Sequence, residues 1–575
     1  MTDGAALPPG LILIASGLLT LLVPRPVRQA LQVGAPVALL GYLWYLAGLS
    51  GPVEAGPFAG VDAYVTEAEY LGMQLYPVRA DALGMIFAVV FAITSALGGL
   101  YALSLDRAKE LAALQVYAGS AVGAVLAGDV ITLFVFWEVM AIASTIVIWM
   151  GGEDARGAGL RYAAIHFLGG ALLMAGVAGY VQTTGQTAFT EMPSEGLIAG
   201  LVLIAFLVNS GAWPLNAWLP DAYPRASWAG TVFLSAFTTK TAIYTLIRGF
   251  PGEEWLLWLG VITMVYGIVY ALVESEIRRL LCYAIIAQSG FLLVGAGLGT
   301  DMTLNGAAGH AFVSILYSIL LFMVAGAVMR QTGRRELSAL GGLWRQMPFT
   351  ALMAVIGGLC ISAFPGTGAY VTKSLISSGA GYAGNFAVWL ALTAAGVGVV
   401  LHAGLRFQWG IFGGDDRRLQ AGDPDWAMRA AMGIAAVIVL AIAFVPQSYY
   451  AALPHPVDYS PYKAGLLLSQ LQLLLGGVLV FFLMLRLMPE SRGITLDTDW
   501  LYRGAGPYAV RAIALGWLTG YERWADRWIG NFDRLIESLY RFHGPEGALA
   551  RSRPTGYVAL WMTALLCLLL IFIIV

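Results

Sequence analysis

Ionisable side chains lie inside long apolar stretches of this sequence. Lys240 is the single charged residue of TVFLSAFTTKTAIYTLI (231–247), and Glu138 lies within DVITLFVFWEVMAIAST (129–145). A charge at bilayer depth costs at least about 2.5–3.5 kcal/mol, so such residues usually face a protein interior or a water-filled cavity. Lysine, unlike arginine, shifts its pKa readily when it loses water. Both residues are therefore suited to taking up and releasing a proton inside a membrane.

Four further titratable residues fall in other apolar stretches, namely His166, His310, Lys373 and His402. Because the histidines are distributed among a glutamate and two lysines, we favour the interpretation that they are stations of a hydrated proton relay. A second reading stays open, in which the lysines and glutamate are paired structural charges and the histidines are hydrogen-bonded packing residues.

Metal and cofactor chemistry finds no support in the residue pattern. No histidine or cysteine has metal-ligand spacing, and Cys282, Cys360 and Cys567 lie far apart in apolar runs. The sequence has no Walker, Rossmann or haem motif. The net charge of −2 provides no basic arm for nucleic acid. We therefore expect no catalytic residues, metal or cofactor on this chain, and no nucleic-acid partner.

The composition predicts an all-α polytopic membrane protein. Hydrophobic residues make up 59% of the 575 residues and charged residues 11%, whereas soluble domains carry about 25% charge. Apolar runs of about 20 residues, long enough for the bilayer core, recur throughout. We predict about 16 transmembrane helices: 5–23, 31–49, 82–104, 110–128, 129–149, 160–181, 196–213, 228–249, 255–273, 280–299, 303–329, 350–380, 383–410, 427–445, 464–487 and 556–575.

Arginine and lysine in the short loops predict the orientation. One side of the membrane collects Arg25, Arg28, Arg107, Lys109, Arg156, Arg161, Arg225, Arg278, Arg279, Arg330, Arg334, Arg335, Arg345, Arg417 and Arg418, whereas the other receives Arg79, Arg248 and Lys463 near span ends. Basic loops stay cytoplasmic. We expect a multi-pass protein of a bacterial inner membrane with both termini on the extracytoplasmic side.

Two predicted spans contain helix breakers at comparable places. NSGAWPLNAWLPDAYP (209–224) contains Gly211 and Pro214, and ISAFPGTGAYVTK (361–373) contains Pro365, Gly366 and Gly368. The two breaks are 151 residues apart with an odd number of helices between them, so their units would have opposite topology. Inverted repeats with broken helices are typical of ion pathways near the midplane. The same offset superimposes Glu138 on Gln288 or Ser289, and His166 near Ser318.

Residues 506–544 differ from the rest of the chain. Apolar and aromatic residues recur there at three- and four-residue spacing, with arginines between them. This pattern predicts an amphipathic lateral helix lying in the interface on the cytoplasmic face. The predicted parts are N-terminal helices 1–109, a first five-helix repeat 110–250, a second inverted repeat 251–412, two helices in 413–488, the lateral segment 489–555 and a terminal helix 556–575.

Five motifs resemble one known family. FVFWEVMAIAS, WPLNAWLPDAY, LSAFTTKTAIYTLIRGF, ESEIRRLLCYAIIAQSGFLLVG and FPGTGAYVTKSLI occur in order and are similar to the antiporter-like subunits of Mrp-type Na+/H+ antiporters and respiratory complex I, closest to the Mrp D-type subunit. The resemblance covers about residues 80 to 445. It implies a lateral proton relay in which Lys240 is the central carrier, Glu138 the gate, and His310 with Lys373 the second-half stations.

Three positions depart from the family pattern. The family usually has a lysine where Asn209 and Ser318 stand, and often a lysine where Arg278 stands. We expect a proton-conducting subunit of an Mrp-type cation (Na+)/proton antiporter, a transporter rather than an enzyme, assembled with other membrane subunits in the lipid bilayer. The alternatives are a proton-pumping membrane-arm subunit of a complex I-like or hydrogenase-type redox complex, a carbon dioxide- or bicarbonate-handling relative, and a weakly conducting scaffold or coupling subunit.

Overall fold

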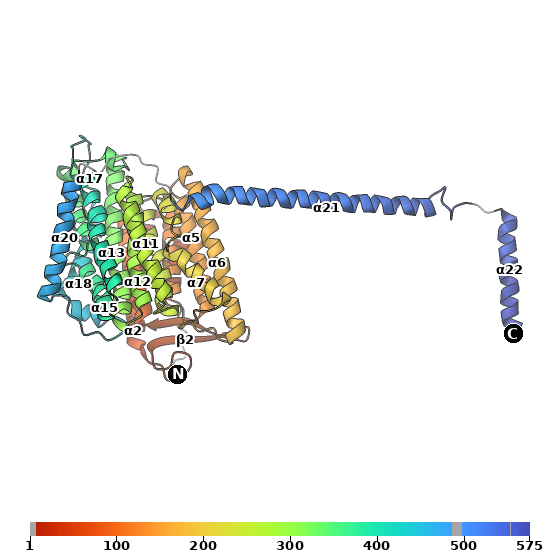
Figure 1. Ribbon diagram of the computed structural model, residues 1–575, viewed down its shortest axis with the longest axis horizontal. Coiled ribbons are helices and arrows are strands. Elements are labelled where there is room, and N and C mark those ends of the chain that lie inside the picture. Colours follow the sequence, from red (N-terminus) through yellow and green to blue (C-terminus); the bar gives the residue numbers. More distant parts are fainter. Residues whose placement is uncertain (1–6, 486–496, 552–553, 575) are drawn as a thin grey trace. The chain divides into compact units, whose positions relative to one another are not determined.

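The computed structural model describes residues 7–485, 497–551 and 554–574 (Figure 1). Contacts divide the chain into two units, Met1–Asp499 and Trp500–Val575. Eleven helices of the described residues are long and apolar enough to cross a membrane, and three shorter apolar helices accompany them. Each of the sixteen predicted spans contains helix. The predicted polytopic helical fold is confirmed.

The first half of the large unit consists of ten α-helices. The sequence sets several starts, because Asp81 and Asp129 accept hydrogen bonds from backbone N–H groups of the first turns of α3 and α5. The helices are α1 (Gly10–Thr20), α2 (Arg25–Leu49), α3 (Ala82–Tyr101), α4 (Ala108–Val125), α5 (Val130–Trp149), α6 (Arg156–Thr184), α7 (Leu197–Ser210), α8 (Trp218–Ala222), α9 (Gly230–Leu234) and α10 (Thr238–Gly249).

The second half surrounds two almost fully buried helices, α12 (Ile277–Leu298) and α13 (Asp301–Thr332), which stand within the bundle in Figure 1. Around them lie α11 (Glu254–Val273), α14 (Pro348–Ile361), α15 (Gly368–Tyr382), α16 (Phe386–Val399), the π-helix η5 (Val400–Arg406), α17 (Phe407–Phe412), α18 (Trp426–Phe444), α19 (Pro446–Tyr450) and α20 (Ala464–Met484).

Both predicted helix breaks are present. Helix α7 ends at Ser210, and Gly211 follows in the left-handed conformation with φ 70°. Helix α14 ends at Ile361 and α15 begins at Gly368. The structure corrects the eighth span, which was predicted as one helix, because α9 and α10 are separated by residues 235–237. Lys240 therefore lies in the first turn of α10.

A small antiparallel sheet connects α2 to α3. It contains β1 (Gly51–Pro52), β2 (Asp62–Tyr70) and β3 (Met73–Asp81), and β2 is visible at one end of the bundle in Figure 1. Leu71 and Gly72 both have positive φ angles, 52° and 74°, in the turn between β2 and β3. Two consecutive positive φ angles are typical of tight hairpin turns. The prediction missed these strands.

The smaller unit contains the predicted lateral helix and the terminal helix. Helix α21 (Gly506–His543) is continuous over 38 residues, which corresponds to about 57 Å at 1.5 Å per residue. Trp517, Tyr521, Trp524 and Trp528 form a ladder of ring contacts with centroids 5.9–6.0 Å apart. Helix α22 (Thr555–Ile574) is apolar throughout its described length. The predicted long amphipathic helix is confirmed.

Candidate proton relay

Lys240 lies in the interior of the large unit. All residues of α10 are buried, and the Lys240 Nζ atom donates a hydrogen bond to Thr239 Oγ1 at 3.2 Å. Among the described residues no ion pair joins this ammonium to a carboxylate. The position in the first helical turn adds the partial positive charge of the helix N-terminus. The site therefore holds a lysine in surroundings that offer its positive charge little compensation.

Glu138 belongs to a different contact. Its side chain is half-buried on α5 and lies against α6, where a Cβ atom built on Gly170 would approach Glu138 Oε1 to 1.9 Å. The Oε1 atom has no hydrogen-bond partner within the described chain. The glycine at position 170 thus makes room for the carboxylate, which is not paired with Lys240.

His166 and Asn209 occupy the space between α6 and α7. His166 is fully buried, with its ring 4.0 Å from the Tyr162 ring and 4.6 Å from the Trp218 ring. Asn209 is close enough to His166 to interact with it. Nevertheless, neither the two ring nitrogens nor the two amide atoms make a hydrogen bond of normal geometry to any described residue. Buried polar atoms of this kind normally bind ordered water.

His310 is the best-connected of the predicted residues. Its Nδ1 lies 2.9 Å from Thr372 Oγ1 on α15, and its Nε2 lies 3.1 Å from Gln288 Oε1 on α12. Tyr317 donates a hydrogen bond to the same Gln288 oxygen at 3.0 Å. Both Lys240 and Lys373 are near enough to act on His310 electrostatically. The hydrogen bonds of His310 therefore connect α13 to α12 and α15.

Lys373 lies beside the second helix break. Its Nζ atom donates to the Ile361 carbonyl oxygen at 3.0 Å and lies 4.4 Å from the centre of the Phe291 ring. A freed carbonyl and an aromatic face both stabilise a cation. The ammonium also borders a cavity of about 170 Å³ whose wall includes the hydroxyls of Ser374 and Ser377. His402 is fully buried nearby, and both its ring nitrogens lack a partner in the described part.

The three substituted positions have different surroundings. Arg278 is 2% exposed and donates to Ala226 O at 2.8 Å, to Thr231 Oγ1 at 3.0 Å and to the Pro224 carbonyl oxygen. These bonds hold the segment between η2 (Tyr223–Arg225) and α9 against α12. Ser318 is buried on α13, eight residues after His310. Arg278 is thus engaged in a structural contact.

Some of the buried polar atoms without hydrogen-bond partners in the described residues lie on or near the predicted relay. They include atoms of Glu138, His166, Asn209, Asn216, Thr241, Gln288, Ser289, Ser362 and His402, whereas others, such as those of Ser16, Thr94 and Gln115, lie elsewhere in the bundle. The helices of the predicted relay form an unbroken series of packed neighbours, α5–α6–α7–α10–α12–α13–α15, and η5 packs on α12 and α14. A buried polar group without a partner costs about 1–3 kcal/mol, so water would normally bind to these atoms.

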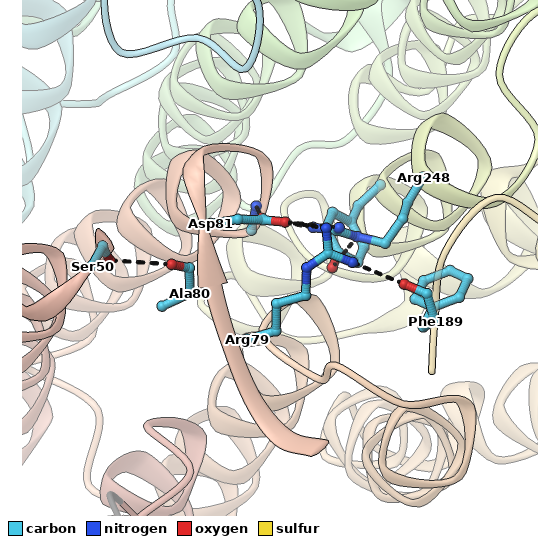
Figure 2. A network of polar contacts seen from close by, with 8 residues as sticks. Ser50, Arg79, Ala80, Asp81, Phe189 and Arg248 are labelled. Atoms are coloured by element: carbon cyan, nitrogen blue, oxygen red, sulfur yellow. Dashed lines mark hydrogen bonds and ion pairs between the residues drawn. The ribbon is translucent and has the colours of Figure 1, made fainter. Parts of the chain in front are cut away.

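An ion network that the sequence analysis missed fixes the end of the Lys240 helix. Figure 2 shows Asp81 beside Arg248 and Arg79. Asp81 accepts from Arg248 Nη1 and Nη2 at 2.8 and 2.7 Å and pairs with Arg79 Nη2 at 2.7 Å. Arg79 also donates to the Phe189 carbonyl oxygen at 3.0 Å. The network ties β3, the loop after α6 and the last turn of α10 together.

Gln288, Thr372 and Tyr317 were not predicted as site residues, although the repeat offset had marked Gln288 as the counterpart of Glu138. In the described residues no group of three or more histidine, cysteine or acidic residues could hold a metal ion. The arrangement offers titratable groups, hydroxyls and space for water. Groups of these kinds are able to pass protons along hydrogen bonds.

Comparisons with known proteins agree with the motifs. Residues 127–398 match the family described as NADH:quinone oxidoreductase/Mrp antiporter, transmembrane. The chain is 31% identical over 271 residues to the D-type subunit of the Na(+)/H(+) antiporter of Alkalihalophilus pseudofirmus, covering 44% of this chain and 55% of that protein. It is 29% identical over 291 residues to the M-type subunit of the NADH-quinone oxidoreductase of Pseudomonas aeruginosa, covering 46% and 57%. The matched stretch therefore spans little more than half of each relative.

Two solved structures share the fold. A chain of the Mrp complex from Dietzia sp. DQ12-45-1b superimposes with a TM-score of 0.66 at 22% identity, covering 80% of this chain and 97% of that one. A chain of the membrane-bound sulfane sulfur reductase, an archaeal respiratory membrane complex, gives a TM-score of 0.70 at 21% identity, covering 98% and 99%. The similarity of each structure to this chain is a similarity of fold.

Proposed function

We propose that this chain, which matches the NADH:quinone oxidoreductase/Mrp antiporter family over residues 127–398, is an antiporter-like membrane subunit that conducts protons within a multisubunit Mrp-type monovalent cation (Na+)/proton antiporter. Lys240 is the central carrier, Glu138 the gate, and His310 with Lys373 the second-half relay. His166 and His402 are further stations. The similarity to a D-type antiporter subunit supports the cation-coupled assembly over the alternatives.

The row of unpartnered buried polar atoms is the observation that carries this proposal. It has members on α5, α6, α7, α10, α12 and η5, including atoms of Glu138, His166 and His402, whereas His310 on α13 and Lys373 on α15 have hydrogen-bond partners. Water in such a row would complete the hydrogen bonds that the protein leaves open. Asn209 stands in this row, so an amide and water would replace the usual lysine at that position. In this proposal, conduction proceeds without the two missing lysines.

A redox-driven complex is the second candidate. The likeness to the sulfane sulfur reductase chain extends over 98% of this chain, including the region of α21 and α22. The similarity to an NADH-quinone oxidoreductase subunit points the same way. In that case the same relay would pump protons in a membrane arm. The third candidate function is a weakly conducting scaffold, in which Asn209 and Ser318 interrupt the relay.

The partners and the orientation belong to the proposal as well. We place the chain in a bacterial inner membrane with both termini outside the cytoplasm and α21 on the cytoplasmic face. The predicted six parts of the chain, with two inverted repeats at 110–250 and 251–412, remain part of this hypothesis. Reporter fusions at the two ends and in the loop 333–347 test the topology.

A single lysine replacement tests conduction. Lys240→Ala should abolish cation/proton exchange in everted membrane vesicles that contain the whole assembled complex, because no other described side chain in the first turn of α10 can carry the proton. The matched control is Lys463→Ala, since Lys463 is exposed just before α20. Wild-type exchange by an assembled Lys240→Ala complex would refute conduction. Mass spectrometry of co-purified chains separates the two assemblies, because iron–sulfur or quinone-reducing chains would favour the redox complex.

A further inference from the structure

The cavity beside Lys373 lies between α15, α16 and α20. Its volume of about 170 Å³ is more than ten times the space of about 10–15 Å³ that one water molecule needs. The lining combines an ammonium, several hydroxyls and an amide with aromatic and aliphatic side chains. A cavity of this kind is suited to a ligand that has a polar head and an apolar body.

Two deeply buried polar groups form the polar part of the cavity wall. Lys373 is 7% exposed and Ser362 is 6% exposed. The ammonium donates to the carbonyl oxygen of Ile361, the residue directly before Ser362, so the two groups lie near each other. Among the described residues, Ser362 Oγ has no hydrogen-bond partner and no carboxylate pairs with Lys373. Since an ammonium has three N–H donors, this wall can donate hydrogen bonds to an anion.

The cavity also reaches the outer surface of the helix bundle. Ser469 of α20 lines the cavity and is exposed, and its neighbour Leu468 is 59% exposed. Trp389 of α16, which lines the cavity as well, is 37% exposed. Both helices belong to segments that are long and apolar enough to cross the membrane. A ligand would therefore enter this cavity from the bilayer.

The depth of the cavity selects the kind of lipid. Gly396 of α16 and Leu474 of α20 line it, and each lies near the middle of its apolar segment. The hydrocarbon core is about 30 Å thick, so its middle is about 15 Å from either head-group layer. The phosphate of a phospholipid stays in that layer, whereas a single-chain fatty acid can bring its head deeper. A carboxylate at this depth needs a partner of opposite charge, which Lys373 supplies.

We propose that this cavity binds the carboxylate of a long-chain fatty acid from the bilayer. The carboxylate pairs with the Lys373 ammonium and accepts a hydrogen bond from Ser362 Oγ, while the first part of the chain lies against apolar residues of α16 and α20. Hydrogen bonds between charged groups are about twice as strong as neutral ones. The paired ammonium has fewer free N–H groups through which to pass a proton, so the bound acid slows exchange. This slowing rests on the proposed proton conduction, whereas the binding does not.

Photoaffinity labelling of the full complex tests the site. Palmitic acid that carries a photoreactive diazirine should form adducts with cavity residues of α16 or α20, which mass spectrometry locates. Unlabelled palmitate should compete, whereas palmityl alcohol, which has the same chain without the charge, should not. Lys373→Gln should lower the labelling severalfold, because it removes the positive charge that holds the carboxylate.

A pair of glycine variants provides the matched control. Gly396→Leu fills the cavity, since Gly396 lines it and a Cβ atom there meets no atom within 4 Å. Gly476→Leu places the same side chain at an equally open position of α20 that does not line the cavity. Labelling should fall severalfold in Gly396→Leu and stay at the wild-type level in Gly476→Leu. If Gly396→Leu does not assemble, Ser469→Leu replaces it.

Exchange in vesicles supplies the second measurement. Added palmitate should slow cation/proton exchange severalfold more in Gly476→Leu than in Gly396→Leu vesicles. Proton leak that the acid causes in the lipid is the same for both variants and cancels in this comparison. Equal slowing in the two variants overturns the inhibition.

Three labelling results overturn the site itself: equal labelling of the two glycine variants, equal competition by palmityl alcohol, and no adduct on α16 or α20 in an assembled complex. The last result would mean that another subunit covers these helices. Labelling is measured without transport. Full exchange by Lys240→Ala would therefore refute conduction while leaving the labelling result to decide the fatty-acid site.

Discussion

Replacement of Asp81 removes the negative charge that two buried arginines share. Asp81 is 6% exposed and makes three short contacts, of 2.8, 2.7 and 2.7 Å, with Arg248 and Arg79. Breaking a buried ion pair by removing one partner costs about 3–5 kcal/mol, because the remaining charge stays buried without compensation. Asp81→Asn should therefore destabilise the fold by about that amount while preserving the cap of α3, since asparagine caps helices as well as aspartate.

Thermal unfolding of the purified, detergent-solubilised complex measures this effect. For a chain of 575 residues, a loss of about 3–5 kcal/mol corresponds to a decrease in apparent Tm on the order of 2–4 °C. Asp81→Ala should melt lower still, because loss of the hydrogen bond to the Gly84 N–H costs about 1 kcal/mol more. The double variant Asp81→Asn with Arg248→Met should recover part of the loss, because it removes one uncompensated cation. A wild-type Tm for Asp81→Asn would refute the reasoning, as would strict additivity of the two changes.

The same residue predicts an acid limit to stability. Burial raises the pKa of Asp81, but Arg248 and Arg79 outweigh burial and lower this pKa from 3.8 to about 2. A lowered carboxyl pKa stabilises the folded state fully above the unfolded value and progressively less as the pH falls through the folded value. The contribution of Asp81 to the free energy of unfolding should therefore be complete above about pH 4 and decline between 3.8 and about 2. The Tm difference between wild type and Asp81→Asn should narrow over that interval.

Two further substitutions test the path and its supports. Gly170→Ala places a methyl group 1.9 Å from the present position of Glu138 Oε1, so cation/proton exchange in vesicles should slow. The control variant Gly200→Ala should leave exchange unchanged, because the space around Gly200 is open. Equal exchange rates for both variants would contradict the placement of Glu138. Asp497→Asn weakens the hydrogen bonds that this buried carboxylate accepts from one tyrosine of α11 and one of α12. The free energy of unfolding should decrease by about 1.5–3 kcal/mol, which lowers the apparent Tm. An unchanged Tm would show that these bonds contribute little to stability.

Much of the fold followed from the lengths of the apolar runs. The two predicted breaks were readable because Gly211, Pro214 and Pro365 mark interrupted helices in the sequence itself. The sequence did not predict the break between α9 and α10 or the π-segment around His402, because neither distortion contains a proline. The sequence analysis did not identify the hairpin between β2 and β3, although Leu71 and Gly72 stand between two segments that form strands.

The sequence by itself determined that this chain crosses a membrane many times and that its titratable residues must face the interior, because the cost of a charge in hydrocarbon leaves few alternatives. The tertiary structure decided which of these groups meet. Packing of α12, α13 and α15 brings Gln288 and Thr372 to His310, whereas Glu138 lies against Gly170 and forms no ion pair with Lys240 among the described residues. Hydrophobic length is a local property of the chain, but proton transfer depends on contacts between residues that are far apart in sequence.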